Sequence, residues 1–213
     1  VNEFAPAFDA SPYTFNLAED ASVTDAVGSV SATDNDGTAS LTYSITAGNS
    51  GGKFAITSGG ALTVADALDY ETATSYTLTV QVSDGTNTDS GSVTVNVSDV
   101  NEFAPAFDAS PYTFNLAESA NINDAVGSIS ATDNDGSASL TYSITAGNSG
   151  GKFAIDGVTG DIELSDTLDY ETATSYTLTV QVSDGTNTDS GTVTVNVSDV
   201  NEFAPAFDAS PYT

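Results

Sequence analysis

Acidic side chains occur in groups along this chain, where most turns would use a single Asp. Asp34 stands two residues before Asp36, and Asp69 stands two residues before Glu71. A single Asp in a turn usually serves a side-chain-to-backbone hydrogen bond. Grouped carboxylates instead suit Ca²⁺, which takes about six to eight oxygen ligands and can bridge several carboxylates at once. The grouping therefore favours a cation site over a series of ordinary turns.

The overall charge is strongly acidic, with 30 Asp and Glu against 2 Lys and Arg in 213 residues and a formal net charge of −28. Such a chain repels nucleic acid, which is excluded as a partner. A solvated acidic surface, as in proteins from salty water, is the alternative to calcium binding. The motif positions favour calcium for the grouped carboxylates, whereas Asp9, Asp20, Asp25, Asp66 and Asp89 lie outside the motifs and are expected to be solvated.

Catalytic chemistry has little support in this sequence. His and Cys are both absent, which removes the usual general base, the commonest zinc ligands and any disulfide. The segment from Gly48 to Gly52 matches the G-x-S-x-G nucleophile motif but has no His to serve it. The turn from Asp34 to Gly37 fails as an EF-hand loop, because Tyr43 would stand where a bidentate Glu is needed. We therefore expect no enzyme activity.

One segment marks the joints between repeated units. Asp99-Val-Asn-Glu-Phe-Ala-Pro-Ala-Phe107 recurs from Asp199 to Phe207, and it recurs without its first residue from Val1 to Phe8. Internal repetition of this kind indicates tandem domains. We expect one domain over residues 1–99, a second over 100–199, and a linker with the start of a third over 200–213. The chain carries no signal peptide and no long apolar run, and is expected to be a piece of a longer protein.

Short alternating segments fill each unit. In the first unit they are residues 13–17, 27–32, 41–45, 54–56, 61–64, 76–82 and 93–97. Period-two alternation rich in Val, Thr and Tyr, interrupted by Gly, Asn and Asp, predicts strands. About seven strands with one apolar face each predict an all-β fold, a seven-stranded Greek-key sandwich of the immunoglobulin type, in both units.

The motifs taken together resemble a cadherin repeat. Leu17-Ala-Glu19 matches the family's first-strand glutamate, Asp34-Asn-Asp36 its D-x-D, and Leu68-Asp-Tyr-Glu71 its L-D-R-E. Val82-Ser-Asp84 matches the late-strand aspartate, and the joint segment matches D-x-N-D-N-x-P-x-F. The five motifs occur in family order across the whole of both units. The resemblance implies sandwiches joined end to end, with calcium ions bound in each joint.

The resemblance also implies which residues hold the ions. For the central joint the implied ligands are Glu19, Asp69, Glu71, the carbonyls of Val100 and Phe103, Asn101, Glu102, Asp133, Asp135 and Asp184. For the two outer half-sites they are Asn2, Asp34, Asp36, Asp84, Glu118, Asp169, Glu171, Asn201 and Glu202. Glu102 replaces the family's Asp and Phe103 its Asn, and the loop after Asp135 lacks the usual Asn, so a weaker outermost ion is expected.

These features predict an extracellular extender or adhesion segment, in which calcium between repeats makes a rod rigid. The near-identity of the two units favours a bacterial surface adhesin over an animal cadherin. The expected partners are calcium, neighbouring repeats and a cell-surface protein or polysaccharide. The alternative is a carbohydrate-binding or homophilic-binding module, which the absence of Trp disfavours.

Overall fold

The computed structural model describes residues 2–36, 40–136 and 139–206. The chain divides into two compact units, Val1–Asn101 and Glu102–Thr213, each of which is described by itself. The Gly37 end of the predicted turn and the predicted start of a third repeat from residue 207 onward lie outside the described residues.

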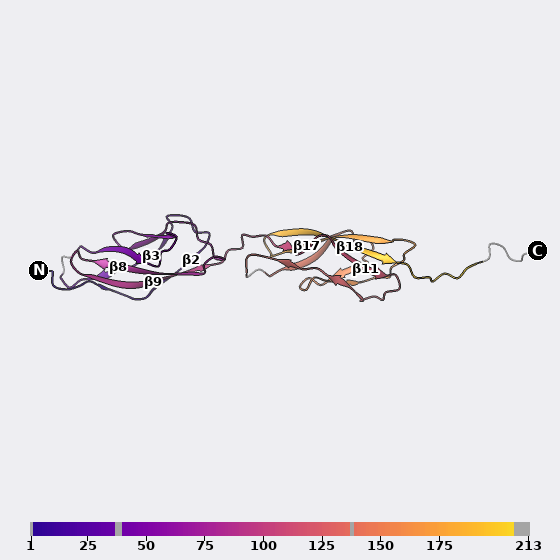
Figure 1. Cartoon of the computed structure of the whole chain (residues 1–213), viewed down its shortest axis with the longest axis horizontal. Helices are drawn as coiled ribbons and strands as arrows, with labels where there is room; N and C mark the ends of the chain where they lie inside the picture. The colour runs from indigo at the N-terminus through magenta and orange to yellow at the C-terminus, as the bar shows by residue number, and fades with distance from the viewer. Residues whose placement is uncertain (1, 37–39, 137–138, 207–213) are drawn as a thin grey trace, which may run out of the picture. The chain divides into compact units, whose positions relative to one another are not determined.

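The first unit is built from strands (Figure 1). They are β1 (Ala7–Phe8), β2 (Tyr13–Ala18), β3 (Ala26–Ser29), β4 (Ala32–Thr33), β5 (Thr42–Ala47), β6 (Phe54–Ile56), β7 (Ala61–Val64), β8 (Ser75–Ser83) and β9 (Thr88–Ser98).

Two sheets form the layers of this unit. One sheet has the order β2-β9-β8-β5 and the other β3-β7-β6, while β1 pairs with β4. The β2–β9 pair is parallel, with Ala18 opposite Ser98, and β8 runs antiparallel to β9, with Ser75 opposite Asn96 and Ser83 opposite Thr88. The register therefore gathers the end of β2, the start of β8 and the end of β9 at one end of the unit.

The core lies between the two sheets. Leu78 and Val80 of β8 and Val93 and Val95 of β9 are fully buried, and they pack in one cluster with Leu62 of β7. Between them stand exposed or half-buried polar residues, as the period-two pattern requires. Apolar side chains in contact from both sheets confirm the predicted sandwich.

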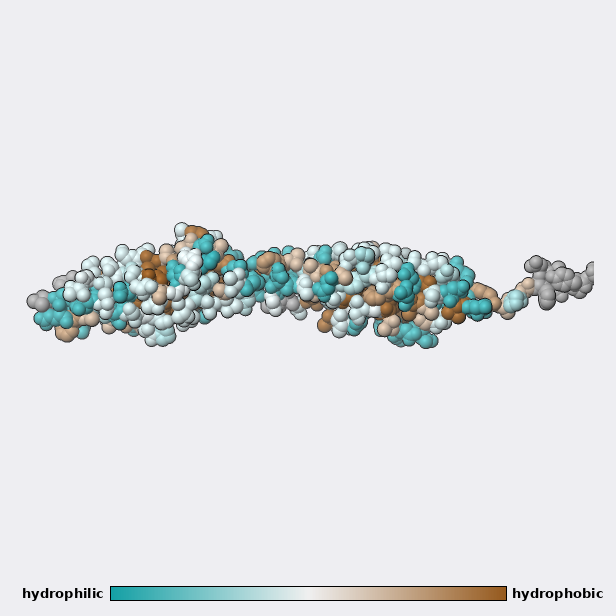
Figure 2. Space-filling model, in the orientation of Figure 1, coloured by the Kyte–Doolittle hydropathy of each residue, from teal (hydrophilic) through white to brown (hydrophobic). Residues whose placement is uncertain are grey.

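The second unit repeats this arrangement with β10 (Ala106–Phe107), β11 (Tyr112–Ala117), β12 (Ala125–Ser128), β13 (Ala131–Thr132), β14 (Thr141–Ala146), β15 (Phe153–Ile155), β16 (Asp161–Leu164), β17 (Ser175–Ser183) and β18 (Thr188–Ser198). Its sheets have the orders β11-β18-β17-β14 and β12-β16-β15, with β10 paired to β13. Figure 2 shows mostly pale and teal residues on the visible face of each unit, with brown residues scattered among them.

The all-β prediction is confirmed, with two local differences. The segment 27–32, expected as one strand, is divided into β3 and β4, because the two parts pair with different strands, β3 with β7 and β4 with β1. The two-residue strands β1 and β10 were not predicted from the sequence, because two residues show no periodicity. Within the described residues there is no helical segment with the length and apolarity that a bilayer crossing requires.

Candidate metal centre

Glu19 is the buried acid at one end of the first unit. It directly follows β2, and its side chain is only 6% exposed. Oε2 accepts a hydrogen bond from the backbone N–H of Tyr70 at 2.5 Å, and Oε1 accepts one from the backbone N–H of Val100 at 2.8 Å. Each carboxylate oxygen is therefore fixed by a different segment of the chain.

Two further acids lie beside Glu19, on the turn that precedes β8. Asp69 accepts hydrogen bonds from the Thr72 backbone N–H and hydroxyl, both at 2.8 Å. These bonds, the hydroxyl contribution being the largest, lower the pKa of Asp69. One carboxylate oxygen each from Glu19, Asp69 and Glu71 lie within 4.8 Å of one another. The three acids thus form a cluster with the spacing of a cation site.

The opposite end of the first unit carries Asp34, Asp36 and Asp84. Asp36 Oδ2 accepts hydrogen bonds from the backbone N–H groups of Glu3 and Phe4, at 3.0 and 2.8 Å. Asp84 Oδ1 accepts hydrogen bonds from Asn87 and Thr86, which lower the pKa of Asp84, the Asn87 bond contributing most. Short polar loops after β4 and β8 therefore aim these carboxylates at the segment that enters the unit.

The corresponding end of the second unit holds the most buried acid of the two units' described parts. Asp135 is 2% exposed, and its Oδ2 accepts a hydrogen bond from the backbone N–H of Phe103 at 2.9 Å. One oxygen each from Asp133, Asp135 and Asp184 lie within 4.8 Å of one another. Asp184 Oδ1 is held by the backbone N–H groups of Thr186 and Asn187, both at 2.6 Å.

The other end of the second unit repeats the Glu19 arrangement. Glu118 accepts hydrogen bonds from Tyr170 N–H at 2.6 Å and from Val200 N–H at 2.7 Å. It forms one group with Asp169 and Glu171 and another with Asp199 and Glu202. Partial loss of hydration, and then the charges of Glu118, Glu171 and Asp199, raise the pKa of Glu202. Like charges are therefore crowded at this end of the unit.

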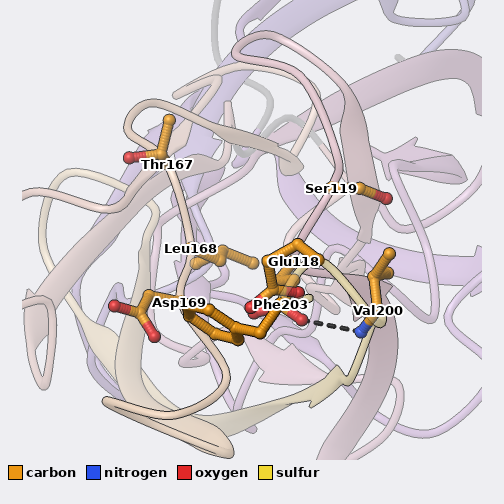
Figure 3. A pocket seen from close by; sticks show the side chains of 8 residues that line it. Glu118, Ser119, Thr167, Leu168, Asp169, Val200 and Phe203 are labelled. Atoms are coloured by element: carbon orange, nitrogen blue, oxygen red, sulfur yellow. Dashed lines mark hydrogen bonds between the residues drawn. The ribbon is translucent and has the colours of Figure 1, made fainter. Parts of the chain in front are cut away.

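A pocket of about 450 Å³ opens beside this last group, lined by Glu118, Ser119, Thr167, Leu168, Asp169, Val200, Glu202 and Phe203. Figure 3 shows the hydrogen bond from Val200 to Glu118, with the Phe203 ring beside the Glu118 carboxylate. Leu168 points into the pocket, whereas Thr167 and Ser119 point away from it. Apolar side chains and carboxylates thus line the pocket together.

The donor sets fit a hard cation. Every group consists of carboxylate oxygens, the ligands that calcium prefers in proteins. Asp34 Oδ2, Asp84 Oδ2, Asp133 Oδ2 and Asp135 Oδ1 are buried oxygens without a hydrogen-bond partner. A buried carboxylate oxygen without a partner is costly, and a bound cation would remove that cost. The residues therefore fit calcium.

The other predicted ligands lie in the joint segments, and several of these residues take part in hydrogen bonds. The Val100 N–H is used by Glu19, and the Phe103 carbonyl accepts a hydrogen bond from Asn187 Nδ2 at 2.9 Å. Asn2 Oδ1 accepts one from Asn87 Nδ2 at 3.3 Å. Asn101 ends the first unit and Glu102 begins the second, and Asn201 is exposed.

Two kinds of residue lie at these sites but were not among the predicted ligands. Asp199 joins the Glu118 and Glu202 group, although its motif was recognised only as part of the joint segment. Asn87 and Asn187 tie the entering segment to the site through the carbonyls of Phe4 and Phe103. Sequence alone carried no signal for these amides, because the partners lie more than eighty positions away in the chain.

The protein-family model of the cadherin domain matches residues 13–98 and 112–198 of this chain. Human Protocadherin Fat 1 is 39% identical over 224 residues, covering 100% of this chain and 5% of that protein. The Protocadherin-like wing polarity protein stan of Drosophila melanogaster is also 39% identical, over 226 residues, covering 100% of this chain and 6% of that protein. The chain thus spans about a twentieth of these relatives.

Solved structures give the same result. Mouse Cadherin-23 EC22-24 has a TM-score of 0.85 and 26% identity, with 94% of this chain and 68% of that chain covered. The Protocadherin GammaB4 extracellular domain has a TM-score of 0.80 and 25% identity, with 93% of this chain and 35% of that chain covered.

Proposed function

This chain belongs to the cadherin family of extracellular adhesion proteins, and we propose that it is a calcium-stiffened spacer within a longer member of that family. The observation that carries the proposal is the clustering of carboxylate oxygens at one end of the first unit and at both ends of the second. Buried carboxylate oxygens without a hydrogen-bond partner on Asp34, Asp84, Asp133 and Asp135 support it. Such clusters are costly without a counter-ion, and calcium supplies one.

The proposed ligands of the central joint come from both units. Glu19, Asp69 and Glu71 would contribute from the first unit, and Asp133, Asp135 and Asp184 from the second. The segment between them would add Asn101, Glu102 and the carbonyls of Val100 and Phe103. Calcium supplies the positive charge that lets these carboxylates lie together, and ions held by both units would limit the motion of one relative to the other.

The outer half-sites would bind calcium together with the repeats that precede and follow in a longer chain. The proposed residues are Asn2, Asp34, Asp36 and Asp84 at one end and Glu118, Asp169, Glu171, Asn201 and Glu202 at the other. We propose domain limits at residues 99 and 199, so that each joint segment serves as the linker before the next repeat.

The expectation of a bacterial adhesin has no support in the comparisons, since the relatives described above are human and fly proteins. A polysaccharide partner likewise has no support. Neighbouring repeats and homophilic contact with another copy are the partners that the family suggests, and no observation favours a catalytic role.

A double-mutant cycle tests whether the two units share calcium. Asp69→Asn and Asp135→Asn are made singly and together in the full chain, and calcium binding is measured by isothermal titration calorimetry. If both residues hold the same ions, the losses in binding free energy should be non-additive. Asp20→Asn, an exposed acid outside the motifs, is the matched charge control.

A second pair provides the comparison for that cycle. Asp69→Asn combined with Asp169→Asn affects two different proposed sites, so these losses should add. Additive losses in both pairs would mean that the units bind calcium independently. An unaltered chain that takes up no calcium at all would overturn the proposed function.

A further inference from the structure

The two basic residues of the chain occupy equivalent positions in the two units. Lys53 Nζ donates hydrogen bonds to Asp66 Oδ2 at 2.9 Å and to the Ala67 carbonyl at 2.5 Å. Lys152 Nζ donates to Asp166 Oδ2 and to the Thr167 carbonyl, both at 2.7 Å. A chain with 30 acidic residues therefore places both of its cations at the same point of the fold.

That point is the segment leading into the acidic turn. Lys53 directly precedes β6, and its carbonyl accepts the backbone N–H of Ala65 at 2.8 Å. With its side chain bound to Asp66 and to the Ala67 carbonyl, Lys53 contacts three successive residues. The next residues are the buried Leu68 and then Asp69, so the lysine anchors the start of the turn that carries Asp69 and Glu71.

The contact persists where the neighbouring side chains differ. Ala65 and Ala67 of the first unit correspond to Ser165 and Thr167 of the second, yet the lysine bonds to the aspartate and to the carbonyl in both. The lysine side chains are 25% and 24% exposed, and the aspartates 58% and 50%. An exposed ion pair alone contributes little to stability. The additional carbonyl bond is what fixes the backbone.

We propose that Lys53 and Lys152 are positioning residues for calcium, which hold the Asp69–Glu71 and Asp169–Glu171 turns in their ligand-bearing conformation without touching the ion. This inference rests on the proposed function. For removal of the lysine, the proposal predicts a change in calcium affinity opposite to the change that simple electrostatics predicts. A nearby cation repels Ca²⁺, so charge alone would make calcium bind more tightly when the lysine is removed. Loss of positioning makes calcium bind more weakly.

The test is a calcium titration of the full chain carrying Lys53→Met. Nuclear magnetic resonance monitors the titration through the backbone amide signals of Tyr70 and Tyr170. Each of these amides donates to the glutamate of its own acidic group, so each reports one site. We expect the Tyr70 dissociation constant to rise about two- to fivefold, the range of a weak surface ion pair. The Tyr170 value should not change, and Lys53→Arg should restore most of the affinity.

Lys152→Met is the matched control, since it changes the net charge equally but should shift the Tyr170 value instead. In EDTA, hydrogen exchange of the Tyr70 and Ala73 amides should accelerate in Lys53→Met, which shows the effect on the turn without any calcium. If Lys53→Met unfolds the first unit, Lys53→Gln, which keeps a donor, takes its place.

Unchanged or tighter calcium binding at Tyr70 would overturn the positioning role while leaving the proposed function intact. The absence of any calcium-dependent shift in the unaltered chain would instead overturn the proposed function itself. Equal losses at Tyr70 and Tyr170 in Lys53→Met would show an effect that does not act through the Asp69–Glu71 turn, and would also overturn the inference.

Discussion

Glu19 Oε2 lies 2.5 Å from the backbone nitrogen of Tyr70, a residue 51 positions away in the sequence. The other oxygen of the same carboxylate accepts the Val100 N–H. A single buried acid therefore joins the end of β2, the turn before β8 and the segment after β9. This arrangement makes Glu19 both a structural residue and a proposed calcium ligand, and the two roles can be separated.

Glu19→Ala should destabilise the first unit even in EDTA. It leaves the Tyr70 and Val100 N–H groups without their acceptor, at a cost of about 1–3 kcal/mol for each group that stays buried. Urea denaturation can be monitored through the nuclear magnetic resonance signals of Val80 in the first unit and Val180 in the second. The loss of stability should appear in the Val80 transition only. Asp20→Ala, on the exposed neighbour, should leave both midpoints unchanged, and an equally stable Glu19→Ala chain would contradict the assignment.

Leu78→Ala should weaken the first unit by about 2–5 kcal/mol, because it leaves a cavity in a fully buried position between the sheets. The loss should be the same with and without calcium, since Leu78 belongs to the core and not to an acidic group. The same urea experiment measures it, with Thr77→Ala on the exposed side of β8 as the control. A loss that disappeared on adding calcium would show that core and site are not independent.

The strands were predictable because the local alternation and the burial agree. Residues 76–82 and 93–97 were expected as strands, and they form most of β8 and β9. Glu19, Asp69 and Glu71 were also predicted together, and they do lie together. The resemblance to a family with a known ligand order supplied that grouping, since the local pattern alone says nothing about distant pairs.

The parts that sequence could not supply depend on long-range geometry. The Asn187 side-chain amide donates a hydrogen bond to the Phe103 carbonyl, and nothing in Asp184-Gly-Thr-Asn187 identifies that partner. Lys53 stands out in the sequence only as one of two basic residues, and its role depends on the path of the backbone at residues 65–67. The expected strand over 27–32 is divided because its two parts pair with different strands, β7 and β1, which the local alternation does not reveal.

Acid should remove the contribution that the Asp156 carboxylate makes to the stability of the second unit, which has no counterpart carboxylate in the first unit. Asp156 Oδ1 accepts hydrogen bonds from the Thr159 and Val158 N–H groups, and these bonds, Thr159 first, lower the pKa of Asp156. A lowered folded pKa means that the contribution is complete above the unfolded value of about 3.9 and is lost as the pH falls through the folded value. Asp156→Ala should therefore reduce the second unit's stability at pH 7, and this loss should shrink as the pH falls below about 3.9.

The first unit supplies the control for this titration. Thr57 occupies the equivalent hairpin position and accepts the Ala61 N–H through its hydroxyl, which does not titrate in this range. Thermal unfolding of Thr57→Ala and Asp156→Ala should show a pH-independent loss for the first and a pH-dependent loss for the second. Parallel pH profiles for the two variants would contradict the assigned role of the Asp156 carboxylate.

Calcium should raise the unfolding temperature of the chain progressively, and the rise should continue above saturation of the sites. Binding to the folded state alone stabilises by RT ln(1 + [L]/Kd), which is about 1.4 kcal/mol per site at ten times Kd. Scanning calorimetry over a calcium series should show the rise, and Asp135→Asn should reduce it more than Asp20→Asn. Equal shifts in the two variants would indicate general screening of the acidic charge.

Small-angle X-ray scattering of the unaltered chain, in EDTA and then in millimolar calcium, tests the central claim most directly. If ions are held by both units, adding calcium should increase the maximum dimension and reduce the flexibility seen in the scattering curve. Asp69→Asn combined with Asp135→Asn should not respond. Identical curves with and without calcium, under conditions where calorimetry shows that calcium is bound, would contradict the stiffened-spacer account.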